Sequence, residues 1–231
     1  MSRILAGLLL ILSLVLPARA ELLPLASPGG AERFTRAAAG PAALSMLVNL
    51  ETEMYLTFCG PASLATALNS LGIHEPTPAV FHPHRRVTQE SLFTAENLLV
   101  RSYSDVQIAG LTLEQLGQFA RNLGTEAVAT HADAMDVDGL RARIRTAMAE
   151  PSSRVVLNYL RSALGQVGEG HVSPAAAFDA ASDSVLILDV ARYKYPPVWV
   201  PLPLLHQAML PPDAASGRPR GLLVLTTRSR P

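Results

Sequence analysis

Apolar positions along the chain follow two different spacings, and the spacing changes near Pro151. Before that residue, apolar side chains recur every three or four positions, as they do on the buried face of a helix. This spacing, together with residues that favour helix ends, predicts helices over residues 30–39, 41–50, 59–71, 90–99, 112–124 and 136–149. Beyond it, short apolar runs predict strands over residues 154–160, 171–178, 185–190 and 221–227, and a short helix over 201–209.

The order of these segments indicates the fold class. A helical N-terminal half followed by a strand-rich C-terminal half predicts an α+β protein, which we expect to form two lobes that share one cleft. Residues 75–88 carry three prolines and are predicted to form a loop. The chain has no internal repeat and no low-complexity tract.

The first twenty residues have the pattern of an export signal. Arg3 supplies the positive charge, residues 4–16 supply the apolar stretch, and Ala18 and Ala20 are the small residues that a signal peptidase recognises. The apolar stretch is short for a membrane span. We therefore predict cleavage after Ala20, a single domain over residues 21–231, and a periplasmic or secreted protein with no stable membrane span.

Composition narrows the function classes. Removing Arg3 and Arg19 with the signal reduces 19 basic residues to 17, against 19 acidic residues. This balance gives no electrostatic footprint for nucleic acid. Because the chain contains only one cysteine, no internal disulfide can form, and packing must supply the stability.

That cysteine, Cys59, is the first candidate for chemistry. A lone thiol in an exported protein is buried and inert, paired with another molecule, or kept for its reactivity. The following residues, Gly60 and Pro61, favour a helix that begins at the thiol. The positive end of the helix dipole would then lie at Cys59 and stabilise the thiolate, which is the reactive form.

His171 and Asp189 are candidate partners for the thiol. Small residues flank His171 on its N-terminal side, and Asp189 ends the apolar run 185–188. If the two strands pair as antiparallel neighbours, Asp189 could orient the imidazole, and the imidazole could activate Cys59. Each feature alone also fits a structural residue: an inert cysteine, a histidine in a turn and a capping aspartate.

The histidines allow a competing use. His82 and His84 lie in one short loop, with His74 nearby. Imidazoles in this pattern could hold zinc or copper. The spacing offers no convincing third ligand, so a histidine-rich surface loop is the other interpretation.

Three segments around the candidate residues resemble one known family. Residues 55–63 with 67–71 resemble the nucleophile helix of the phytochelatin synthase family, residues 164–174 its histidine segment, and residues 186–202 its aspartate segment. A looser resemblance extends from Leu25 to Thr227.

The resemblance implies a papain-like fold and a reaction. The helical N-terminal lobe would carry Cys59 as nucleophile, and the antiparallel-sheet lobe would carry His171 as general base and acid and Asp189 as its orienter. Family members attack the Cys–Gly bond of glutathione, release glycine and hold a γ-glutamylcysteinyl thioester. Water then gives γ-glutamylcysteine, and a second glutathione gives a phytochelatin. The resemblance implies glutathione as the partner and allows a homodimer. It requires no cofactor. It also implies that Cd²⁺ or Zn²⁺ could stimulate the reaction, or that a metal–glutathione thiolate could be the substrate.

The chain departs from the family pattern at several positions. The family has a Gln that helps to form the oxyanion hole, and here Glu53 stands in its place. A carboxylate is a poor oxyanion donor unless it is protonated. Residues 175–178 are smaller than the family's usual stretch, and the Cys-rich C-terminal region of the plant enzymes is absent, which favours glutathione hydrolysis over polymer synthesis.

Two further residues are candidates for substrate binding. Arg192 and Tyr195 follow Asp189 closely, and an arginine can bind a substrate carboxylate with two hydrogen bonds. The alternative for Arg192 is a structural ion pair.

Two alternatives to the glutathione reaction also remain: a papain-like peptidase of the bacteriocin-leader type, and a homologue impaired by Glu53 that binds metals or thiols without catalysis.

Overall fold

One antiparallel sheet organises the protein. The computed structural model describes residues 22–37 and 41–228, so the predicted signal peptide lies outside the described residues. The sheet has seven strands in the order β1-β6-β5-β4-β3-β7-β2, and every neighbouring pair is antiparallel. The strands are β1 (Leu23–Pro24), β2 (Thr125–His131), β3 (Ser153–Leu160), β4 (Gly170–Asp179), β5 (Ser184–Ile187), β6 (Val198–Pro201) and β7 (Gly221–Thr227).

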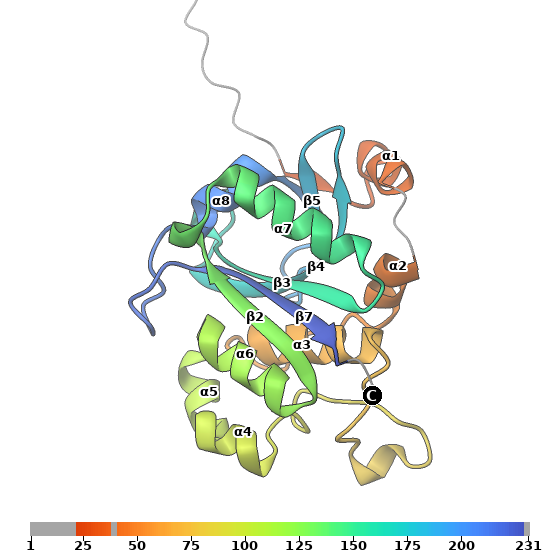
Figure 1. Ribbon diagram of the computed structural model, residues 1–231, viewed down its shortest axis with the longest axis vertical. Coiled ribbons are helices and arrows are strands. Elements are labelled where there is room, and N and C mark those ends of the chain that lie inside the picture. The colour runs from red at the N-terminus through yellow and green to blue at the C-terminus, as the bar shows by residue number, and fades with distance from the viewer. Residues whose placement is uncertain (1–21, 38–40, 229–231) are drawn as a thin grey trace, which may run out of the picture.

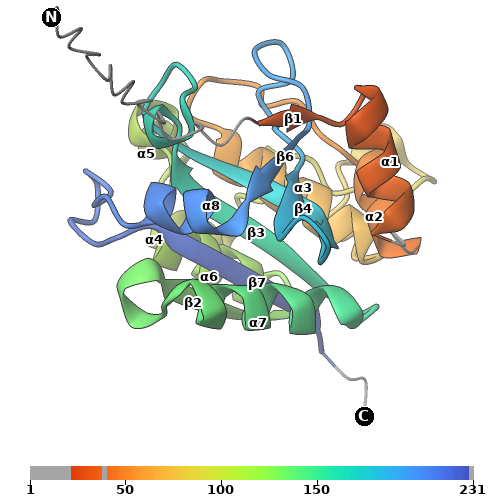
Figure 2. The ribbon, with the colours of Figure 1, turned by 90° about the horizontal axis from the view of Figure 1, so that it is seen from above.

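Helices cover both faces of this sheet (Figures 1 and 2). They are α1 (Pro28–Arg36), α2 (Pro41–Val48), α3 (Cys59–Ser70), α4 (Ala95–Val100), α5 (Tyr103–Ala109), α6 (Leu113–Asn122), α7 (Val137–Ala149) and α8 (Leu202–Met209). Short 3₁₀ turns lie at Ala79–Phe81, Ala132–Ala134 and Ser162–Leu164. In the part of the chain that the structure describes, no helix is long and apolar enough to cross a bilayer.

The central strands are buried on both faces because their side chains alternate between two cores. In β3, Val156 packs into the core formed with α3 and α6, whereas Val155 and Leu157 pack into the core formed with α7 and α8. Such strands are expected to be apolar throughout. A third apolar cluster joins α1 and α2 to β4, β5 and β6 around the buried Trp199.

The nucleophile-candidate helix α3 lies between the sheet and the surrounding helices, and all its residues after Cys59 are buried. Gly72, with φ of +74°, allows the chain to turn away after the helix. Two polar side chains fix its position. Ser63 donates to the carbonyl of Val172 in β4 at 3.1 Å, and the Asn69 amide exchanges two hydrogen bonds with the backbone of Val87.

Several predicted elements need correction. The helix predicted over residues 90–99 begins only at Ala95, because Thr94 caps its first turn. The strand predicted over residues 185–190 ends at Ile187, so Asp189 follows the strand and does not lie in it. Elements β1, β2, β6 and α5 were not predicted.

The change from helices to strands along the chain is less sharp than expected. Strands β1 and β2 lie before Pro151, in the part of the chain predicted to be helical, and occupy the two edges of the same sheet. Their partners are β6 and β7, far away in the sequence. The coarser prediction of a mixed fold with an antiparallel sheet is confirmed.

An ion pair between Arg36 and Asp179 ties α1 to the end of β4, and it predicts a pH dependence of stability. Two guanidinium nitrogens donate to the carboxylate at 3.1 and 2.6 Å, and these bonds lower the pKa of the buried Asp179 to about 2 from 3.8. A lowered folded-state pKa stabilises the fold above pH 4, and this contribution disappears as the pH falls toward 2. The shift corresponds to about 2 kcal/mol.

We therefore expect Arg36→Met to lower the free energy of unfolding at pH 7 and to flatten its decline between about pH 4 and pH 2. Urea unfolding at several pH values measures this difference. The difference in unfolding free energy between the variant and the parent removes the contribution of other carboxylates that titrate in the same range. A constant difference at every pH would contradict the expected role of the ion pair.

Candidate active site

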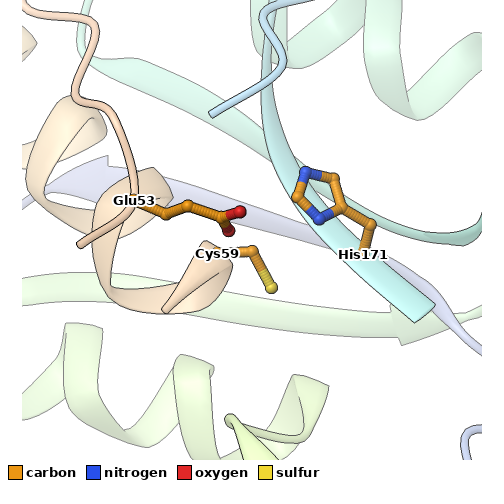
Figure 3. A group of neighbouring side chains, drawn as sticks. All are labelled: Glu53, Cys59 and His171. Atoms are coloured by element: carbon orange, nitrogen blue, oxygen red, sulfur yellow. The ribbon is translucent and has the colours of Figure 1, made fainter. Parts of the chain in front are cut away.

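The sequence candidates Cys59, His171 and Asp189 come together although they lie on three separate segments. Cys59 is the first residue of α3 and is half-buried. His171 lies near the start of β4 and is buried. The Cys59 Sγ, a ring nitrogen of His171 and a carboxylate oxygen of Glu53 all lie within 4.8 Å of one another (Figure 3).

The imidazole of His171 is held by contacts on two sides. Its Nε2 lies 3.0 Å from Oδ1 of Asp189, so its Nδ1 is the nitrogen left to face the thiol. The ring also packs edge-on against Tyr159, its register partner in β3, with the ring centroids 5.8 Å apart. The expected pairing of the two strands is confirmed, because β4 and β5 are antiparallel neighbours.

Asp189 is fully buried and ionised. Burial by itself raises the pKa of Asp189, but hydrogen bonds from His171 and Arg161 outweigh it and lower the value to about 2. The Arg161 guanidinium donates two bonds of 2.7 and 2.9 Å to the two carboxylate oxygens, and the backbone N–H of Ala191 donates a third bond. This carboxylate therefore accepts a hydrogen bond from the Nε2–H group of His171. The bond keeps the imidazole in the tautomer in which Nδ1 carries no proton.

Sequence reasoning missed Arg161. It follows β3 directly, is 4 % exposed, and also donates to Gln166 at 2.9 Å and packs over the ring of Tyr195 at 5.0 Å. A buried aspartate at the end of an apolar strand requires a cationic partner, and that requirement was the available signal. Which arginine supplies the partner depends on β3 lying next to β4, and the sequence does not specify that pairing.

We expect Arg161→Lys to lower kcat/KM for the reaction of this site by about tenfold, because a lysine cannot form both hydrogen bonds to Asp189. Arg161→Leu should have the larger effect, since it leaves the Asp189 charge buried without a cation. Steady-state kinetics with thermal unfolding of both variants measures this order. Equal loss in the two variants would contradict a role based on charge and geometry.

Burial of the site does not favour a thiolate at Cys59. Burial, followed by the negative charge of Glu53, raises the pKa of the Cys59 thiol to about 12, although backbone hydrogen bonds at Val172 and Gly60 act in the opposite direction. Burial likewise lowers the pKa of His171. Both shifts oppose charge separation between the thiol and the imidazole, so the activated thiolate expected from the helix dipole stays a prediction.

Glu53 lies beside the thiol, where the family resemblance places the oxyanion-hole residue. Its side chain is 7 % exposed, and its backbone N–H donates to the carbonyl of Val190 at 3.0 Å. The Tyr193 hydroxyl donates to Oε1 at 2.5 Å, whereas Oε2 is buried and has no hydrogen-bond partner among residues 22–37 and 41–228. Burial raises the pKa of Glu53, the bond from Tyr193 lowers it, and the charge of Asp189 raises it further.

The two candidate substrate-binding residues differ in their surroundings. Arg192 is exposed, and among the described residues it has no ion-pair partner, so the alternative of a structural ion pair is not supported. The Tyr195 hydroxyl accepts a bond from the backbone of Val167 at 2.7 Å, and its ring packs under Arg161. Tyr195 therefore supports the loop before His171, and neither contact tests a substrate role.

The histidine loop does not assemble a metal site within the described residues. His82 and His84 are exposed, and His74 approaches the side chain of Asn69 at 3.3 Å. The group of potential metal ligands that the described residues do form is Glu53, Cys59 and His171. The interpretation as a histidine-rich surface loop fits this geometry.

A large cavity of about 960 Å³ lies away from the thiol, at the opposite end of α3. Its lining includes Ser70, the last residue of that helix, and residues 176–178. These three belong to the stretch 175–178, whose side chains are smaller than is usual in the family. Because a helix rises about 1.5 Å per residue, Ser70 and Cys59 lie roughly 16 Å apart along the axis. The small residues at 176–178 therefore shape this distant cavity and do not line the thiol site.

A thiol next to an imidazole that a buried carboxylate orients is the arrangement used by cysteine-dependent acyl-transfer enzymes. Comparison with known proteins agrees with the local resemblance described above. A model of the family described as phytochelatin synthase matches residues 13–222, and the chain belongs to this family.

Named relatives show the same relationship. The chain is 35 % identical over 180 residues to glutathione gamma-glutamylcysteinyltransferase 3 of Lotus japonicus, covering 78 % of this chain and 36 % of that protein. It is 33 % identical over 181 residues to glutathione gamma-glutamylcysteinyltransferase of Schizosaccharomyces pombe, covering 78 % and 42 %. For glutathione gamma-glutamylcysteinyltransferase 2 of Arabidopsis thaliana the identity is 35 % over 180 residues, covering 78 % and 38 %. The chain thus spans less than half the length of these relatives.

Proposed function

We propose that the protein is a thiol enzyme that cleaves the Cys–Gly bond of glutathione through a γ-glutamylcysteinyl thioester on Cys59. The observation that carries the proposal is the constellation of Cys59, His171 and Asp189, with the 3.0 Å bond that orients the imidazole. The names of the relatives support glutathione as the substrate. The position of the thiol at the start of a buried helix packed on an antiparallel sheet supports a papain-like fold.

The first half-reaction acylates the thiol. Nδ1 of His171 accepts the thiol proton as Sγ attacks the carbonyl carbon of the Cys–Gly bond, and the carbonyl oxygen becomes an oxyanion. As the C–N bond breaks, the imidazolium returns the proton to the departing amine of glycine. Asp189, held ionised by Arg161, stabilises the imidazolium between these two steps.

The second half-reaction releases the acyl group. His171 removes a proton from water, the resulting hydroxide attacks the thioester, and γ-glutamylcysteine leaves as the Cys59 thiol reforms. The amino group of a second glutathione can replace water, and the product is then a phytochelatin. Both routes begin from the same acyl-enzyme, so the acceptor alone decides which product forms.

Incubation of purified protein with glutathione tests this proposal. We expect glycine and γ-glutamylcysteine to appear in solution and the acyl group to appear on the protein by intact mass spectrometry. Phytochelatin formed in the same reaction reports the share that goes to transfer. Cleavage of bacteriocin-leader peptides with no release of glycine from glutathione would instead favour the peptidase alternative.

Two further parts of the proposal have separate support. We propose that Cys59, His171, Asp189 and Arg161 suffice for the acyl transfer without a resident cofactor. Repeating the assay with Cd²⁺ or Zn²⁺ at excess glutathione tests whether metal–glutathione thiolates stimulate the reaction.

We also propose export to the periplasm or the medium, supported by the charged and apolar pattern of residues 1–20. N-terminal sequencing of the protein from its native cells would give Glu21 as the first residue.

A further inference from the structure

Three side chains with metal-binding atoms converge beside the start of α3. A carboxylate oxygen of Glu53, Sγ of Cys59 and a ring nitrogen of His171 lie within 4.8 Å of one another. Figure 3 shows the carboxylate of Glu53 and the ring of His171 facing each other, with the Cys59 side chain below the space between them. We propose that they form a binding site for a borderline or soft divalent cation such as Zn²⁺ or Cd²⁺, and that the bound cation blocks the acyl-transfer reaction.

The chemistry of the three donors selects the class of cation. A thiolate, an imidazole and a carboxylate are all ligands of Zn²⁺, and the thiolate favours soft cations over Mg²⁺ or Ca²⁺. Two anionic donors and one neutral donor balance a charge of +2. With Gln in place of Glu53, as in the family pattern, the set would have one anionic donor fewer.

The unpartnered oxygen of Glu53 is an independent observation that points to a ligand. The residue is 7 % exposed, and within the part of the chain that the structure describes its Oε2 has no hydrogen-bond partner. A buried polar atom without a partner costs free energy that a partner would recover. A cation bound between Glu53, Cys59 and His171 would supply that partner.

Neighbouring side chains hold two of the three proposed ligands in place. Nε2 of His171 is bonded to Asp189, which leaves Nδ1 as the ligand atom, and Tyr193 holds Oε1 of Glu53, which leaves Oε2 as the ligand atom. Such outer contacts orient metal ligands in proteins. Tetrahedral zinc ligands lie about 3.3–3.7 Å apart, so atoms that lie within 4.8 Å of one another need to approach by no more than about 1.5 Å to bind one cation.

Metal binding and catalysis would exclude each other because they use the same atoms. A thiolate bound to the cation cannot attack the Cys–Gly carbonyl, and Nδ1 bound to the cation cannot accept the thiol proton. Three protein ligands leave a fourth position open to water or to an added thiol. Excess glutathione sequesters free metal, so the block should appear only when the metal exceeds the available thiol.

Titration of the purified protein with Co²⁺ and Cd²⁺ in thiol-free buffer tests the site directly. Because Cys59 is the only cysteine in the chain, any thiolate-to-metal charge-transfer absorption reports this residue. We expect one equivalent of metal, a charge-transfer band, and protection of Cys59 from alkylation by iodoacetamide. Mg²⁺ should produce none of these effects, and Cys59→Ser should lose the band.

Matched variants identify the third ligand. Glu53→Gln is nearly isosteric and should weaken Cd²⁺ binding by about tenfold or more. Glu51→Gln changes a neighbouring glutamate that pairs with Arg86 outside the cluster, and it should leave the affinity unchanged. The double variant His82→Ala/His84→Ala removes the exposed histidines and should also bind normally. Unchanged affinity in Glu53→Gln, or binding without a charge-transfer band, would overturn the proposal.

The metal site does not depend on the glutathione reaction, whereas the block of acyl transfer rests on the proposed function. Metal binding is measured without glutathione, whereas glycine release is measured without added metal. A protein that binds Cd²⁺ through Cys59 but leaves glutathione intact would refute the proposed function, and the block with it, but not the metal site. A protein that releases glycine but gives no charge-transfer band would refute only the metal site.

Discussion

Replacing Cys59 by Ala is expected to abolish the release of glycine from glutathione. The thioester route requires a nucleophile that forms a bond with the carbonyl carbon, and alanine has no such atom. Removal of the nucleophile from a comparable catalytic triad costs on the order of 10⁶ in rate. Glycine release, followed by quantitative amine analysis, should fall by about this factor, and intact mass spectrometry should show no acyl-enzyme.

This variant is also a sharp test because it should fold normally. Cys59 is half-buried at the first position of α3, and the helix is held by contacts of Ser63 and Asn69 that the substitution does not touch. His82→Ala, at an exposed histidine outside the site, is the matched control and should keep full activity. Activity that survives in Cys59→Ala would show that another group attacks glutathione.

The candidate site could be predicted as far as local sequence determines it. The residues after Cys59 indicate a helix that begins at the thiol, and the apolar runs before Asp189 and after His171 indicate strands that can pair. The structure confirms the helix start and the strand pairing, and it brings the three side chains together. Each of these inferences needed only the spacing of residues within one segment.

What could not be predicted depends on contacts between distant segments. Strand β2 has weak apolar alternation of its own and forms because β7, about a hundred residues later, offers a partner. Arg161 becomes part of the site only because β3 lies beside β4. The helix dipole that favours a thiolate at Cys59 is a local feature of the sequence, whereas the burial and the charge of Glu53 that raise the pKa of this thiol come from the assembled fold.

Replacing Glu53 by Gln is expected to raise turnover of glutathione, measured in metal-free buffer at saturating substrate. The glutamine Oε1 can keep the hydrogen bond from Tyr193, and its amide nitrogen would then take the place of the unpartnered Oε2. That nitrogen donates to a developing oxyanion at any pH, whereas a carboxylate oxygen donates only when protonated. The substitution also removes the negative charge that raises the pKa of Cys59.

The gain can approach about 10²–10³, the worth of one oxyanion-hole donor. It should appear in kcat more than in KM, since the oxyanion exists only along the reaction path and not in bound glutathione. Glu51→Gln, which removes a nearby carboxylate without entering the site, should leave turnover unchanged. A lower kcat in Glu53→Gln would mean that the carboxylate itself takes part in the reaction, and the oxyanion would then depend on backbone N–H groups at the start of α3.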